Sequence, residues 1–104
     1  MDEYAISVCS AGNVSSPTVV GAQAANELLN VKNVKASFVC TPYLEQIYIS
    51  ARSIDKVNVQ VIMEEFGGGG HMNLAGAQVR DKSLGEVIRI LKQIIERKLE
   101  EGDI

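Results

Sequence analysis

The spacing of apolar residues predicts where the strands of this chain lie. Short apolar runs, bounded by polar or turn-forming residues, are typical of strands that are buried in a sheet. Four such runs occur, at residues 4–9, 35–40, 46–52 and 75–79. The second and third are separated only by the short link 41–45, which favours an antiparallel hairpin.

Three other segments have the apolar spacing of amphipathic helices. The first begins at Ser16-Pro17, a typical N-cap and first helical residue, and ends near Leu29. Small residues on its apolar stripe, Gly21 and Ala25, would let it pack close to a sheet. The other two segments are 59–66, capped by Asn58 and ended by Gly67, and 84–99, which Ser83 and Glu86 open as a capping box.

The order of these elements indicates the fold class. Strand, helix, hairpin, helix, loop, strand and helix follow one another without a repeat or a linker. We therefore expect one α/β domain over residues 1–104, with a mixed sheet of four to five strands flanked by helices. A length of 104 residues is ordinary for a single domain with one core.

Composition and charge restrict the partners of this domain. The chain is 46% hydrophobic and 22% charged, with a net charge of −3. A broad electrostatic surface for nucleic acid needs clustered Lys and Arg, so a phosphate site here must be local. The sequence has neither a run of membrane-spanning length nor a signal-peptide pattern at its N-terminus.

The two cysteines give no indication of a metal site. Cys9 and Cys40 lie in apolar, strand-like runs. We interpret them as reduced core residues of a cytosolic domain, with a single disulfide as the alternative. Together with the single histidine they cannot supply the four ligands of a structural zinc ion.

The most distinctive stretch is the glycine run Phe66-Gly67-Gly68-Gly69-Gly70-His71. Glycines let the backbone turn sharply and approach a ligand, and their N–H groups can converge on an anion. The only histidine of the chain follows directly and could add a hydrogen bond or a charge beside a phosphate. We predict an anion-binding loop here, and the alternative is a flexible linker.

A second group of candidate residues lies on the strand 46–52. Ile47, Ile49 and Ala51 alternate with Tyr48, Ser50 and Arg52, so one face is apolar and the other presents a hydroxyl and a guanidinium. That polar face is a good place for a ligand contact. The alternatives are a salt bridge from Arg52 to Asp55, serines that are plain strand-edge residues, and a loop histidine bonded to backbone.

Taken in order, these motifs resemble a known family. Ile49-Ser50-Ala51-Arg52-Ser53, then Asn58-Val59, then the glycine run with its histidine, then Ala75-Gly76, resemble the DHH-associated domain of the DHH phosphoesterases. The resemblance covers nearly the whole chain. It is strongest, from Ile49 through His71, to the C-terminal domain of the membrane-anchored bacterial phosphodiesterases that hydrolyse cyclic di-AMP.

The resemblance implies a division of labour between two domains. In that family a separate upstream DHH domain carries the Asp and His residues that bind two Mn²⁺ ions and convert cyclic di-AMP to linear pApA. The associated domain closes over the cleft and holds the substrate. By this resemblance, Gly68, Gly69 and Gly70 would present backbone N–H groups to a phosphate or nucleotide. His71 would contact the phosphate or steady the nucleotide, and Arg52 would be the charged partner of the phosphate. Ser50 and Ser53 would offer hydroxyl contacts.

The same resemblance implies that the chain is the substrate-binding fragment of a larger signalling hydrolase. With one histidine and scattered aspartates the sequence cannot build a dinuclear metal centre, so it should bind and not hydrolyse. The parent enzyme would be anchored in the bacterial membrane, and this cytoplasmic domain would not touch the membrane. One departure is Leu74, where the family often has alanine, and it could reshape the pocket floor.

Two other functions remain open from the sequence. The same domain could serve an oligoribonuclease, a phosphatase of a bisphosphorylated adenosine, or a RecJ-type exonuclease, although a channel for long single-stranded DNA would need a basic groove. Alternatively, it could be a non-catalytic binding or dimerisation module. Under the phosphodiesterase interpretation, the partners of the domain would be cyclic di-AMP or a short nucleotide, the upstream DHH domain, and a second copy of the chain in a homodimer.

Overall fold

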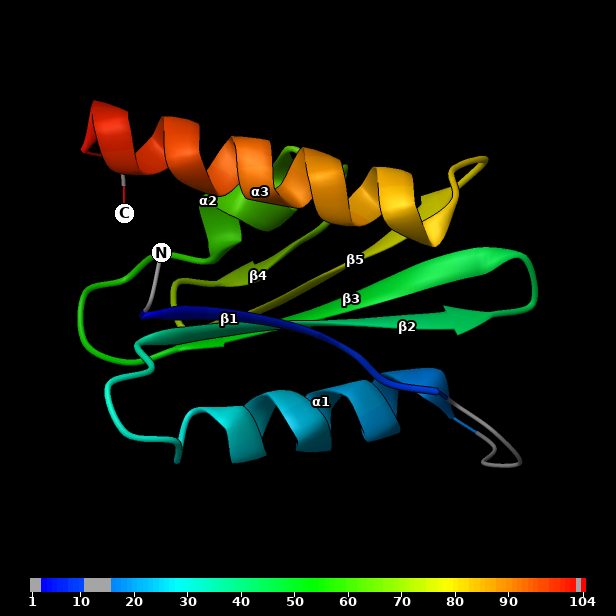
Figure 1. The fold of residues 1–104 in the computed structure, drawn as a ribbon, viewed down its shortest axis with the longest axis horizontal. Coiled ribbons are helices and arrows are strands. Elements are labelled where there is room, and N and C mark those ends of the chain that lie inside the picture. Colours follow the sequence, from blue (N-terminus) through cyan, green and yellow to red (C-terminus); the bar gives the residue numbers. More distant parts are fainter. Residues whose placement is uncertain (1–2, 11–15, 103) are drawn as a thin grey trace.

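The chain folds around a mixed five-stranded sheet (Figure 1). The computed structural model describes residues 3–10, 16–102 and 104. In spatial order the strands are β1-β2-β3-β5-β4. β1 runs parallel to β2, and every other neighbouring pair is antiparallel. The strand bounds are β1 Tyr4–Val8, β2 Ala36–Tyr43, β3 Gln46–Ser53, β4 Gly69–His71 and β5 Leu74–Arg80.

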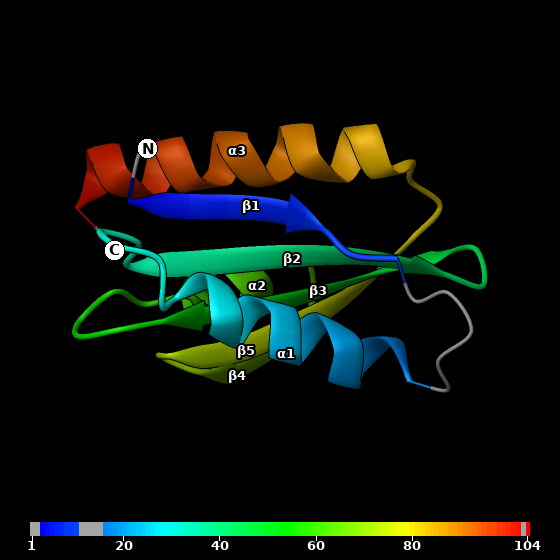
Figure 2. The ribbon, with the colours of Figure 1, turned by 60° about the horizontal axis from the view of Figure 1, so that its bottom comes forward.

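Helices cover the two faces of the sheet unequally. The helix α1 (Pro17–Leu28) packs on one face, against β2 and β3. The helices α2 (Gln60–Glu64) and α3 (Leu84–Glu101) lie on the opposite face (Figures 1 and 2). This arrangement confirms the predicted α/β domain with a mixed sheet flanked by helices. It also leaves the β5–β4 side of the α1 face without a helix packed on it.

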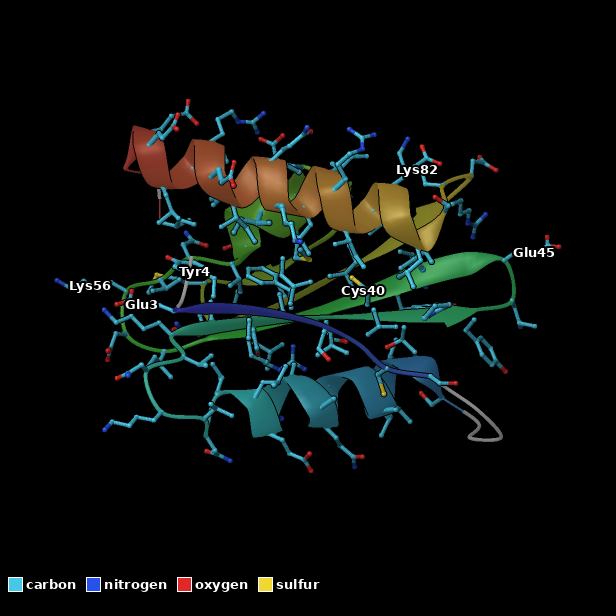
Figure 3. All side chains as sticks on the ribbon, viewed as in Figure 1. Glu3, Tyr4, Cys40, Glu45, Lys56 and Lys82 are labelled. Carbon is cyan, nitrogen blue, oxygen red and sulfur yellow. The ribbon has the colours of Figure 1, made fainter. Side chains whose placement is uncertain are left out.

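The main hydrophobic core lies between the sheet and the α2–α3 pair. Figure 3 shows Cys40 on the α3 side of β2, and its side chain is fully buried there. Alternate residues of the strands, the buried side of α2 and the apolar stripe of α3 supply the rest, including Phe38, Ile62, Leu91 and Ile95. The predicted stripe and capping box of α3 are confirmed, because Ser83 and Glu86 bond reciprocally. At its far end, α3 is tied to the end of α2 by ion pairs from Arg97 and Lys98 to Glu65.

On the other face, small residues bring α1 close to the sheet, as predicted. Ala25 is fully buried, and its carbonyl accepts a hydrogen bond of 2.7 Å from the hydroxyl of Ser37 on β2. A Cβ atom added at Gly21 would lie 2.7 Å from Oγ of Ser50 and 3.0 Å from Oγ1 of Thr41. Any side chain at Gly21 would therefore push α1 away from the strands.

The hairpin between β2 and β3 is tighter than the sequence predicts. The expected link at 41–45 is wrong for residues 41–43, because β2 continues through Tyr43 and pairs with Gln46. Only Leu44 and Glu45 form the turn, and both have positive φ, at 49° and 65°. Two central residues with positive φ define a type I′ turn, whose twist matches antiparallel strands. Figure 3 places Glu45 at this end of the molecule, opposite Tyr4 and Lys56.

The glycine run is not a loop throughout, which corrects the prediction. Gly67 has φ of 81° and ends α2 in the expected left-handed conformation. Gly69, Gly70 and His71, however, form the edge strand β4, joined to β5 by the two residues Met72 and Asn73. So short a connection makes the two strands pair. The linker alternative is therefore also excluded.

Other local expectations can be compared directly with the structure. Oδ1 of Asn58 accepts hydrogen bonds from the backbone of Gln60 and Val61, which confirms its role at the start of α2. Cys9 and Cys40 are both free, so the single disulfide is excluded. No described helix combines the length and apolar content needed to cross a membrane.

Candidate functional site

An open trough of about 560 Å³ lies on the α1 face of the sheet. It runs beside α1 over β3 and β5, and the end of α2 borders it through Gly67 and Gly68. Its lining residues are Thr18, Tyr48, Ile49, Ser50, Arg52, Gly67, Gly68, Leu74, Ala75, Gly76, Ala77 and Gln78. The trough thus contains several of the residues that the sequence singles out, and it extends from the edge of α1 on β3 to β5, on which α1 does not pack.

Strand register shows which side chains share this face. Directly opposite residues in antiparallel strands point to the same side of a sheet, and alternate residues along a strand point to opposite sides. Three cross-strand rows therefore face the trough. They are Tyr48–Gln78, Ser50–Gly76–Gly69 and Arg52–Leu74–His71.

Arg52 supplies the positive charge of the trough. Its Nη1 donates to the carbonyls of Ala51 (2.8 Å) and Ala75 (3.4 Å). Its Nε is buried and has no hydrogen-bond partner among the described residues. Burial lowers the pKa of the guanidinium, which nevertheless stays charged at neutral pH.

The predicted alternative for Arg52 is not found. Within the described ranges, no ion pair includes Arg52, so the salt bridge to Asp55 is absent. A guanidinium that is partly removed from water without a carboxylate beside it is electrostatically incomplete, because burying a charge is unfavourable unless an opposite charge compensates it. Among the described residues, Arg52 therefore has no counter-ion.

His71 lies at the open edge of the same row. Two strand spacings, about 9–10 Å, separate its Cα from that of Arg52. Leu74 stands between them and is 52% exposed, so its side chain forms an apolar step in the row. His71 is itself exposed and does not line the trough, but its position lets it approach a ligand that extends outward from Arg52.

The middle row forms the floor of the trough. Ser50 is only 7% exposed, and among the described residues its hydroxyl has no hydrogen-bond partner. Gly76 and Gly69 follow it across β5 and β4. Gly76 lines the trough and has no side chain, so the floor stays low there between the two outer rows, and Gly69 lies beyond it at the β4 edge.

The glycines differ in what they can do for a ligand. The N–H of Gly68 donates to the carbonyl of Met63 at 2.9 Å, closing the end of α2. In this structure that N–H is therefore engaged within the protein, and Gly68 lines the trough with the rest of its backbone. Gly70 has φ of 142°, which requires glycine, whereas Gly69 has no positive φ and a Cβ added there meets nothing within 4 Å.

Ser53 stands apart from the other candidate residues. It lies on the opposite side of β3 from the trough, and its hydroxyl donates to the carbonyls of Val57 (2.6 Å) and Met72 (3.3 Å). Nδ2 of Asn73 in turn donates to this hydroxyl at 2.9 Å. These bonds hold the segment after β3 against the β4–β5 hairpin, so in this structure the Ser53 hydroxyl connects parts of the fold and does not face the trough.

Sequence reasoning did not select Tyr48 and Gln78 as site residues. They pair directly across β3 and β5 and form one end of the trough, next to Thr18 at the start of α1. The alternation on β3 places Tyr48 on the face of Ser50 and Arg52, and that signal could have identified it. Gln78 lies 30 positions further along, so only the strand register brings it there.

The described residues do not fit a catalytic metal ion. Within that part of the chain, no three His, Cys, Asp or Glu side chains gather in a way that could hold one. We therefore derive no chemical step through a metal in this domain. The trough offers a guanidinium without an ion-pair partner among the described residues, the hydroxyl of Ser50 and an uncharged polar end.

Known proteins are similar to this chain in sequence. The chain is 45% identical over 80 residues to the cyclic-di-AMP phosphodiesterase PdeA of Listeria monocytogenes, covering 76% of this chain and 12% of that protein. It is 41% identical over 104 residues to the cyclic-di-AMP phosphodiesterase GdpP of Geobacillus thermodenitrificans, covering 98% and 16%. The chain thus spans less than a fifth of the length of these relatives.

A solved structure agrees with the sequence comparison. The exopolyphosphatase-related protein of Bacteroides fragilis superposes with a TM-score of 0.75 and 26% identity, covering 88% of this chain and 28% of that one. The sequence model of the DHHA1 domain matches residues 4–97, which are nearly all of the chain. The resemblance to the DHH-associated domain is therefore confirmed, and the chain belongs to the DHHA1 domain family of the DHH phosphoesterases.

Proposed function

We propose that this domain holds the nucleotide substrate of a phosphodiesterase that hydrolyses cyclic di-AMP to linear pApA. The observation that carries the proposal is Arg52, a partly buried guanidinium in a trough, with no carboxylate partner among the described residues. A phosphate is the natural counter-ion for such a group, because charge-assisted hydrogen bonds to phosphate suit the guanidinium. Two relatives of the chain carry the name cyclic-di-AMP phosphodiesterase.

The contacts divide between the rows of the trough. A phosphate at Arg52 would receive hydrogen bonds from the accessible N–H groups of the guanidinium that do not bond to the carbonyls of Ala51 and Ala75. The hydroxyl of Ser50 lies one row along β3 and would donate to the same phosphate or to the sugar. His71, at the edge of the Arg52 row, would contact the part of the ligand that leaves the trough.

The bond cleavage itself is assigned to another part of the longer protein. The described residues offer no cluster for a metal, so the two Mn²⁺ ions typical of the family would belong to an upstream DHH domain. In this proposal the chain is the substrate-holding fragment, and the trough closes over that metal centre. The parent would be anchored in the bacterial membrane with this domain on its cytoplasmic side.

Titration of the 104-residue chain tests the proposal. NMR spectra would be recorded with pApA, cyclic di-AMP and AMP, following the amides of Gly68 to His71 and of β3. Binding with shifts in these residues is expected. Arg52→Ala should weaken binding by about 1.5–3 kcal/mol, the contribution typical of hydrogen bonds to charged groups.

The control variant removes the same charge elsewhere. Arg89 is exposed on α3, on the far side of the sheet, so Arg89→Ala should bind like the wild type. His71→Ala, which changes an exposed side chain, should weaken binding without lowering the melting temperature. Equal affinity of the Arg52→Ala and Arg89→Ala variants would refute the phosphate site. If the chain alone binds none of the ligands, the Arg52→Ala and Arg89→Ala changes are made in the longer protein, and a higher KM for Arg52→Ala alone supports the phosphate site.

A further inference from the structure

The two ends of the trough differ in chemistry. Among the described residues that line it, Arg52 alone is charged, and it marks one end together with Leu74. The other end, toward the β2–β3 hairpin, is formed by Tyr48, Gln78 and Thr18. This end is uncharged but carries an aromatic ring, a carboxamide and a hydroxyl.

The separation of the two ends suits one nucleotide. Tyr48 and Arg52 are four residues apart on β3, so their rows are about 13 Å apart. In the row between them, Ser50 has the only side chain, because the other two residues, Gly76 and Gly69, are glycines. A nucleotide whose phosphate sits at Arg52 can therefore lie along this floor, with its base reaching the Tyr48–Gln78 row.

We propose that the Tyr48–Gln78 row is the base-reading end of the trough and that it selects adenine. This inference rests on the proposed function, because it takes Arg52 as the phosphate contact. Gln78 is exposed, and none of the hydrogen bonds among the described residues uses its carboxamide. Its oxygen and NH₂ group can pair bidentately with N6–H and N7 of adenine, an arrangement that glutamine and asparagine use to recognise this base.

Tyr48 and the absence of charge at this end support the same choice. A tyrosine ring offers a surface on which a base can stack. Guanine is best recognised by an arginine or lysine on O6 and N7. No such side chain lines this end within the described residues, since Arg80 stands one row beyond Gln78 and outside the lining.

Three small ligands separate base recognition from phosphate recognition. The 104-residue chain and its variants would be titrated by NMR with AMP, GMP and ribose 5-phosphate, which keeps the phosphate and sugar but lacks a base. We expect AMP to bind more tightly than the other two, and only the nucleotides should shift the ring protons of Tyr48. Gln78→Ala should weaken AMP binding about 5- to 100-fold and leave ribose 5-phosphate binding unchanged.

Two further variants make the experiment decisive. Gln78→Glu should favour GMP over AMP, because a carboxylate can accept from N1–H and N2–H of guanine and cannot donate to adenine. Gln93→Ala, at an exposed glutamine of α3, is the matched control and should bind like the wild type. Both positions are at the surface, so neither change should prevent folding.

Each other result refutes a defined part of the reasoning. If Gln78→Ala binds AMP as well as the wild type does while Arg52→Ala loses it, the base-reading inference fails and the phosphate site stands. If Gln78→Ala also weakens the binding of ribose 5-phosphate, Gln78 contacts the sugar or the phosphate and not the base, and the inference fails. If none of the three ligands shows binding to this chain that depends on Arg52, the base-reading inference fails, and the KM comparison of the Arg52→Ala and Arg89→Ala variants in the longer protein decides the proposed function separately.

Discussion

Two adjacent glycines should respond oppositely to the same substitution. A Cβ added at Gly68 would lie 2.1 Å from the carbonyl oxygen of Gly76 and 2.7 Å from Cβ of Ala77. A Cβ added at Gly69 would meet nothing within 4 Å. Neither residue has a positive φ, so backbone strain does not enter the comparison and only the available space differs.

The expected energies follow from these distances. The clash at Gly68 is with backbone and a short side chain, which cannot rotate away, so Gly68→Ala should separate the end of α2 from β5. Overpacking of this kind costs about 1–3 kcal/mol. Gly69→Ala should instead stabilise the chain by about 0.4–1 kcal/mol, because alanine restricts the unfolded chain and fits the native backbone. The two variants should therefore differ by about 1.5–4 kcal/mol.

Urea denaturation followed by far-UV circular dichroism measures this difference, with the wild type as reference. A domain of this size changes its melting temperature by about 4–8 °C per kcal/mol, so thermal scans should separate the variants clearly. The added methyl group at Gly69 lies in the row of Ser50, at the β4 edge beside the trough, so Gly69→Ala should also weaken AMP binding while raising stability. Equal stability of the two alanine variants would refute the steric argument.

Two further predictions concern the Asn73 hydrogen bonds beside the site and the buried thiol. Asn73→Ala should lower the free energy of unfolding by about 1–3 kcal/mol, because it removes the Nδ2 donor from Ser53 Oγ (2.9 Å) and from the Asp55 carbonyl (3.1 Å). Chemical denaturation measures this loss. The control is Asn26→Ala, at an exposed position of α1, which should leave the free energy of unfolding nearly unchanged. Burial raises the pKa of Cys40 from 9.0 to about 11, so between these values the native state keeps a proton that the unfolded state loses. Relative to Cys40→Ala, stability should therefore fall by about 1.4 kcal/mol per pH unit from pH 9 to 11, and equal slopes would contradict this reasoning.

The sequence predicts the regular elements well where side chains carry a periodic pattern. The stripe of α3 and its capping box are local signals, and both are present in the structure. The same holds for the alternation on β3, where a one-residue shift would turn apolar side chains toward the trough. Local pattern therefore identified Ser50 and Arg52 as neighbours on one polar face.

The strand β4 could not be predicted in this way. Glycine has no side chain to alternate, and it weakens strands, so a run of glycines has the same pattern in a loop and in a strand. What decides its conformation is non-local: the short Met72-Asn73 turn and the pairing with β5. The same limit applies to the meeting of Tyr48 with Gln78, which depends on register between distant segments.

The glycines of the floor show why local rules fail at this site. Gly69 and Gly76 are paired in the middle row, and a side chain at Gly76 would fill the space beside Ser50, between the rows of Arg52 and Tyr48. A strand of glycines is a poor choice for stability, so its position must be held from outside. The bond from the Gly68 N–H to the carbonyl of Met63 fixes one end of β4. The hydrogen bonds of Asn73 fix the other end. An edge strand that is weak in itself, and that neighbouring elements hold in place, is expected where binding requires an open surface.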